Sequence, residues 1–145
     1  MDTAPRMTFN GVWPTYLVRR QLPGAAAHVP GLIEYIDAQG AREKGFTARY
    51  HEQRFFAGDH PAVRWLKSQV DETVGAFIQH SGVARRVTWS LFCWYNISHL
   101  GDHHAPHTHP RSYLSGTFYV KLPPPPEHLD DPRAQPARIS FSAST

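Results

Sequence analysis

The hydrophobic pattern changes its period at Gly82, and this change constrains the fold more than any other feature of the sequence. Over residues 60–82, apolar side chains recur at steps of three and four, as on the buried face of a helix. These positions are Val63, Leu66, Val70, Val74, Phe77 and Ile78. Asp59 or His60 can cap the start of the helix, and Pro61 suits its first turn. Gly82 suits the C-terminal end, so we predict a helix over this range.

After Gly82 the pattern has the period of two that is typical of strands. Strands are predicted at 86–97, 113–122 and 137–141. A proline-rich loop separates the last two, because proline has no N–H to donate to a sheet. The sequence therefore predicts helices first and then an antiparallel β core.

Two elements are expected in the first forty residues. Residues 9–22 have the pattern of an opening strand broken at Pro14. Residues 30–43 place apolar side chains at helical spacing, with Pro30 at the start and Gly40 at the end. With 145 residues, 41% of them hydrophobic, the chain suits a single domain. That domain is expected to comprise a helical support region at 1–85 and the β core at 86–145.

Composition excludes several classes of protein. The net charge is only +3 and the basic residues are scattered, so no nucleic-acid partner is expected. No signal peptide and no apolar run long enough to span a bilayer is evident, which favours a cytoplasmic protein without a membrane partner. The single cysteine, Cys93, excludes an intramolecular disulfide and a cysteine-based zinc module. It lies in an apolar run and is interpreted as a small buried hydrophobe.

The stretch GDHHAPHTHP, residues 101–110, contains four histidines and is the candidate metal site. In a strand, residues i and i+2 point to the same face, so His107 and His109 would lie about 7 Å apart at Cα. Their imidazoles could converge on one ion, and neutral imidazole suits Fe, Zn, Cu and Ni. Pro110 favours extended backbone at His109. The alternative is a polar loop that is merely rich in histidine, and a third ligand is not obvious, although Asp102 is a candidate.

The segment WSLFCWYNISHLGDHHAPHTHPRSYLSGTFYVKLP resembles a bacterial and phage family of 2-oxoglutarate/Fe(II)-dependent oxygenases. The matching features are Asn96 at a strand end, the H-x-H-P motif, Ser-Gly at 115–116 and the aromatic run that follows. The resemblance implies a double-stranded β-helix, or jelly-roll core, that is mainly β with N-terminal helices. We expect this core to be incomplete at its C-terminal end. It implies a dioxygenase that oxidises a C–H bond of a small-molecule or protein substrate while 2-oxoglutarate is converted to succinate.

The resemblance also assigns roles to individual residues. It implies that His107 is the first Fe(II) ligand, and that His109 stands where most of these oxygenases place Asp. His109 is therefore expected either to bind iron directly or to support the site. Tyr119 and Asn96 are the expected contacts of 2-oxoglutarate.

The family also uses a distal histidine followed by Arg or Lys, and few residues of this sequence follow the H-x-H-P motif in which such a pair could lie. His128 with Arg138 is the only late pairing, and we expect His128 to lie in a loop rather than in the site. The chain is therefore expected to be an oxygenase that is inactive without a distal His/Arg region, or a degenerate, non-catalytic metal-binding or interaction protein. A third reading is a cupin-like metal protein that adds Asp102 or Glu127 to the two histidines. Assembly into a homo-oligomer is left open.

Overall fold

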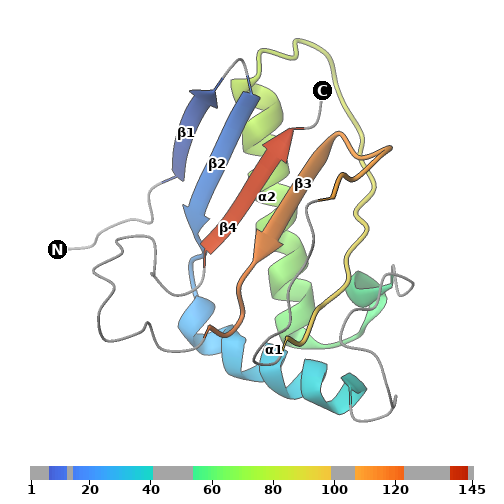
Figure 1. The fold of residues 1–145 in the computed structure, drawn as a ribbon. Helices are drawn as coiled ribbons and strands as arrows, with labels where there is room; N and C mark the ends of the chain where they lie inside the picture. Colours follow the sequence, from blue (N-terminus) through green and yellow to red (C-terminus); the bar gives the residue numbers. More distant parts are fainter. Residues whose placement is uncertain (1–6, 13–14, 41–53, 99–106, 123–137, 144–145) are drawn as a thin grey trace, which may run out of the picture. The chain divides into compact units, whose positions relative to one another are not determined.

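A computed structural model describes residues 7–12, 15–40, 54–98, 107–122 and 138–143. The chain divides into two compact units (Figure 1). One comprises residues 1–25 and 108–145 and contains a β-sheet, and we call it the sheet unit. The other comprises residues 26–107 and contains the helices, and we call it the helical unit.

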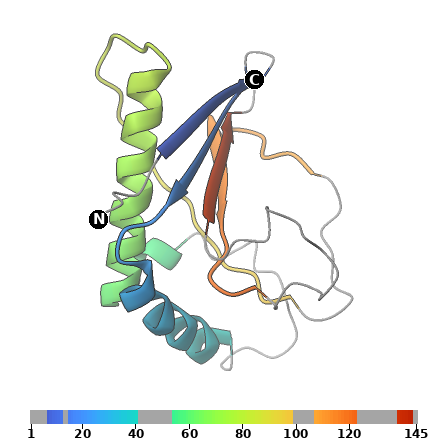
Figure 2. The same ribbon diagram turned by 90° about the vertical axis from the view of Figure 1, so that its left-hand side faces the viewer.

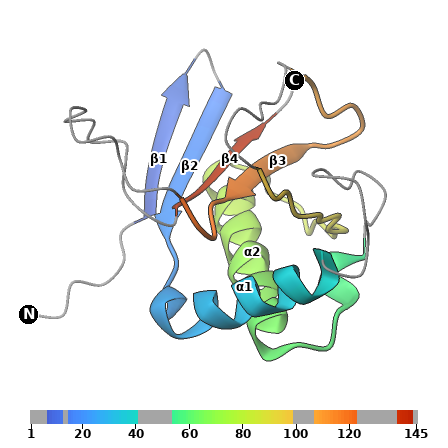
Figure 3. The same cartoon turned by 60° about the horizontal axis from the view of Figure 1, so that its bottom comes forward.

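The sheet unit joins strands from both ends of the chain in one antiparallel sheet (Figures 1 and 3). The strands are β1 (Met7–Val12), β2 (Thr15–Gln21), β3 (Leu114–Phe118) and β4 (Arg138–Ala143). Their order across the sheet is β1-β2-β4-β3. β4, the last of these strands in the sequence, is therefore placed between β2 and β3, so that β1 and β3 are the outer strands among those described.

Buried and exposed side chains alternate along β2, as expected for a sheet that is buried on one face. Val18 and Arg20 are buried on one side, whereas Arg19 between them is exposed. In register, Val18 lies opposite Phe9 of β1 and opposite Phe141 of β4. β2 is thus a central strand with a hydrogen-bonded neighbour on each side.

The helical unit contains α1 (Ala25–Gly40), the short 3₁₀ helix η1 (Phe55–Ala57) and α2 (Pro61–His80) (Figure 2). Leu32 and Ile36 of α1 are buried one turn apart. The buried residues of α2 follow the predicted stripe and are Ala62, Val63, Leu66, Thr73, Val74 and Phe77. Val70 and Ile78 of the same stripe are half-buried.

Both ends of α2 form as predicted. The side chain of His60 is the N-cap and accepts a hydrogen bond from the Ala62 amide, and Pro61 occupies the first helical position. At the other end Ser81 is the C-cap, and Gly82 follows with a φ of 74°. That left-handed conformation is costly for residues with a Cβ, which explains why glycine ends this helix.

The prediction of a mainly β jelly-roll fold is wrong. The described residues form two long helices and a four-stranded antiparallel sheet, and they contain no jelly-roll core. The main discrepancy is at 86–97, where the structure has no strand and only an isolated bridge at Asn96. Side chains of this segment pack within the helical unit instead: the Trp89 indole donates to Asp71, and the Tyr95 ring meets Phe55 edge-on.

Two boundaries in the first forty residues also differ from the prediction. The single strand expected at 9–22 is the antiparallel hairpin β1–β2. The helix expected to start at Pro30 starts at Ala25 and contains Pro30. The alanines at 25–27 are the strongest helix formers, and Gly24, with a φ of 76°, immediately precedes them. They outweigh the one amide hydrogen that Pro30 removes.

In the part of the chain that the structure describes, none of the helices combines the length and the apolar character needed to cross a membrane.

Candidate metal centre

The predicted histidine pair lies in the segment that leads into β3, before the strand begins. His107 is exposed and His109 is half-buried. The Ser112 amide donates to the His109 carbonyl at 3.2 Å, which closes a tight turn over His109–Ser112. Pro110 takes the second position of this turn, where its fixed φ is favourable.

Arg111 takes the third position of the turn with a φ of 72°. This is the left-handed region that glycine usually occupies in such a turn, and a residue with a Cβ is strained there. The turn therefore sets the direction of the chain between His109 and β3 at some cost in backbone energy. Strained backbone of this kind clusters at functional sites, so its position directly after the H-x-H-P motif supports a role for this segment.

The four candidate residues are divided between the two units. Asn96 and His107 belong to the helical unit, whereas His109 and Tyr119 belong to the sheet unit. Within the described ranges, no three His, Cys, Asp or Glu side chains form a group that could hold a metal ion.

The two candidate contacts of 2-oxoglutarate are both accessible. Asn96 is exposed and forms an isolated bridge rather than ending a strand. Tyr119 is the first residue after β3 and is 48% exposed. β3 is shorter than the predicted range 113–122, so Tyr119 lies just beyond the strand and not on it.

The remaining candidates lie outside the described residues or at a position where only the backbone is described. Asp102, His103, His104, Glu127 and His128 fall in the ranges that are not described. The backbone of Arg138 opens β4, opposite Gln21 of β2.

Sequence reasoning missed an aromatic cluster in the helical unit that includes His60. Its ring lies 5.2 Å from that of Tyr35 on α1, and Tyr35 meets Phe55 at 5.8 Å. Phe55 also meets Tyr95 at 5.9 Å. The buried Phe55 ring of η1 therefore contacts both α1 and the segment after α2. Residues 45–58 contain aromatic side chains but no clear period, so their sequence did not predict this packing.

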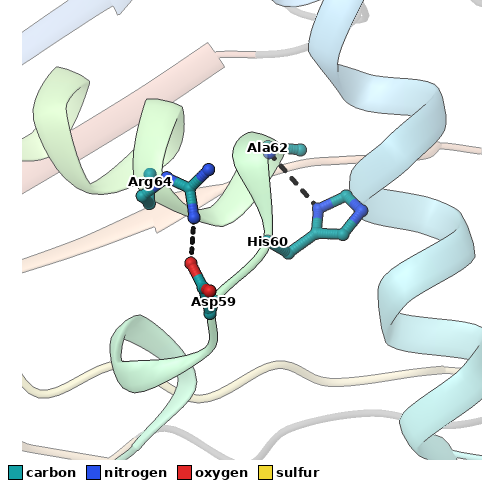
Figure 4. Close-up of polar contacts among 4 residues, drawn as sticks. All are labelled: Asp59, His60, Ala62 and Arg64. Atoms are coloured by element: carbon teal, nitrogen blue, oxygen red, sulfur yellow. Dashed lines mark hydrogen bonds and ion pairs between the residues drawn. The ribbon is translucent and has the colours of Figure 1, made fainter.

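Hydrogen bonding fixes the tautomer of His60 (Figure 4). Its Nδ1 accepts from the Ala62 amide at 3.3 Å, so the ring proton must lie on Nε2. Beside it, Asp59 and Arg64 form an exposed ion pair. His60 therefore acts as a helix cap in the described structure.

The Cys93 thiol agrees with its interpretation as a small hydrophobe. Its Sγ lies 3.7 Å from the Trp94 carbonyl oxygen. Burial raises the pKa of the Cys93 thiol from its ordinary value of 9.0 to about 12. Because the thiolate is the reactive form, this environment disfavours a role for Cys93 as a nucleophile or as a metal ligand.

One comparison with known proteins gives a match. Residues 92–144 match the model of the family described as "Putative 2OG-Fe(II) oxygenase", which is less than half of the chain. All four candidate residues, Asn96, His107, His109 and Tyr119, lie within the matched range. No curated protein and no solved structure matches the chain.

Proposed function

We propose that this chain contributes to a non-haem Fe(II)- and 2-oxoglutarate-dependent dioxygenase site. His107 and His109 are the proposed iron ligands, and Asn96 and Tyr119 the proposed contacts of 2-oxoglutarate. The observation that carries the proposal is the family match over 92–144, which spans all four residues. The family implies both cofactors, Fe(II) and 2-oxoglutarate.

The donor chemistry of the histidine pair fits Fe(II) in part. Neutral imidazole is a suitable ligand for iron, and the usual non-haem site combines two histidines with one carboxylate. His107 and His109 supply two nitrogen donors and no negative charge. Since no third acidic or histidine ligand gathers with them in the described ranges, the pair provides at most two of three protein ligands.

The side chains proposed for 2-oxoglutarate suit a dicarboxylate. The Tyr119 hydroxyl and the Asn96 amide can each donate a hydrogen bond to a carboxylate oxygen. Both are exposed, so a ligand from solution can reach them. With O2 as the oxidant, bound Fe(II) and 2-oxoglutarate would supply the chemistry in which one oxygen atom oxidises a substrate C–H bond while 2-oxoglutarate is converted to succinate and CO2. The role of the protein is to orient these groups and exclude water.

An anaerobic titration tests this function. We expect Fe(II) added together with 2-oxoglutarate to give the weak visible charge-transfer band of a chelated 2-oxo acid. Succinate should also form slowly in air without added substrate. Zn(II) in place of Fe(II) is the control and should give neither signal. A flat visible spectrum at saturating Fe(II) would contradict the proposal.

A further inference from the structure

One edge of the sheet has a sequence that reads almost the same in both directions. β3 is the last strand in the order β1-β2-β4-β3 and pairs with β4 on one side only, as far as the described strands show (Figure 1). The strand and its two flanking residues read YLSGTFY, residues 113–119. The sequence is symmetric about Gly116, with Ser and Thr next to it, then Leu and Phe, then two tyrosines.

We propose that the outer edge of β3 binds β3 of a second copy of this chain, in an antiparallel pair centred on Gly116. A two-fold dimer requires a surface that is complementary to itself. In this register Leu114 faces Phe118 of the second copy, and Ser115 faces its Thr117. Each pair joins side chains of similar character, which is how cross-strand pairs stabilise a sheet.

The residues around the centre suit a close approach of two strands. Gly116 lies on the two-fold axis and faces its own copy, so no cross-strand side-chain pair has to be accommodated at the centre. Continuing the register brings Tyr113 opposite the second Tyr119, and these side chains are 63% and 48% exposed in the single chain. In this register the two rings would lie side by side on one face of the joined sheet, and aromatic cross-strand pairs are among the favourable ones.

The composition of this edge also favours pairing with a second copy, because residues 113–119 contain no charged residue and no proline. Natural edge strands are usually protected from pairing by lysine, proline or a bulge, and β3 has no such residue. The opposite edge, β1, is less suited to pairing with itself. Self-pairing of MTFNGV would place Phe9 against Asn10 and Thr8 against Gly11.

Two double variants that share one substitution test the register. In Ser115→Lys/Thr117→Glu, each lysine faces a glutamate of the second copy, whereas in Ser115→Lys/Thr117→Lys it faces a lysine. Sedimentation equilibrium at low salt should show a wild-type dimer at about 100 µM protein. The Lys/Glu variant should remain dimeric, and the Lys/Lys variant should associate about tenfold more weakly than Lys/Glu. Far-UV circular dichroism checks that both variants fold.

A monomeric wild type, or equal association of the two variants, would overturn the proposal. Disulfide trapping gives a second measurement in a Cys93→Ala background. Directly opposed Cα atoms lie about 4.5–5.5 Å apart, within reach of a disulfide, whereas diagonal ones lie about 7–8 Å apart. Gly116→Cys should therefore form a covalent dimer on mild oxidation, and Ser115→Cys should not. Equal cross-linking at the two positions would exclude this register.

Discussion

Replacing His107 with alanine is expected to lower the affinity of the chain for Fe(II) by about 100-fold or more. Loss of a group that only supports a metal ligand costs 10- to 100-fold, and loss of the ligand itself should cost at least as much. Anaerobic competition with a chromophoric chelator measures the affinity directly. The matched control is His80→Ala, which removes a histidine from the last turn of α2, outside the proposed site.

The same measurement on His109→Ala separates its two proposed roles. A loss as large as that of His107→Ala would make His109 a direct ligand. A loss of about tenfold would make it a group that supports the site. Fe(II) affinity that is unchanged in His107→Ala would remove the assignment of the metal centre to this motif.

The second large effect concerns Cys93. A thiol whose pKa is raised from 9.0 to about 12 has about 1,000-fold less thiolate at pH 8. The higher nucleophilicity of a more basic thiolate offsets part of this loss, so alkylation by iodoacetamide should slow by at least about tenfold. Mass spectrometry of samples quenched over time gives the rate. In urea the rate should rise to that of an ordinary thiol.

A cysteine on the same segment provides the control for this reaction. Ser90 is exposed, so Ser90→Cys in a Cys93→Ala background should react at the ordinary rate. Alkylation of native Cys93 as fast as this control would show that the thiol is not desolvated.

The raised pKa of Cys93 also predicts the direction of one pH effect on stability. The folded chain holds the thiol proton more tightly than the unfolded chain does. The thiol therefore makes its full contribution to the free energy of unfolding below about pH 9, which is its pKa in the unfolded chain. This contribution is lost as the pH rises towards 12. Replacing Cys93 with alanine should flatten the fall in the free energy of unfolding over this range.

The sequence predicted elements whose signals are local. The stripe of α2, its cap at His60 and its glycine stop are all fixed by residues within a few positions of one another, and the structure confirms them. β3 and β4 were also predicted as strands, although β3 is shorter than the predicted range and β4 extends beyond it to Ala143.

The rest of the fold depends on contacts that are distant in the sequence. Residues 86–97 have the composition of a strand, but the Trp89 indole binds Asp71 and Tyr95 packs on Phe55, so tertiary contacts override the local preference. The placement of β4 between β2 and β3 could not be read from periodicity, because period two does not identify the partner of a strand. For the site, the sequence supplies His107 and His109 only as candidate ligands, and these stay a prediction; spacing alone cannot supply a third ligand.

The most direct test of the proposed iron site is histidine NMR with Fe(II). The chain contains ten histidines, and long-range ¹H–¹⁵N spectra resolve their side-chain nitrogens. With one equivalent of Fe(II) under nitrogen, the signals of His107 and His109 should leave the diamagnetic range, whereas those of His28, His60 and His80 should stay in place. Signals of His107 and His109 that remain unshifted, or that broaden only in parallel with those of the other histidines, would contradict iron binding by this pair.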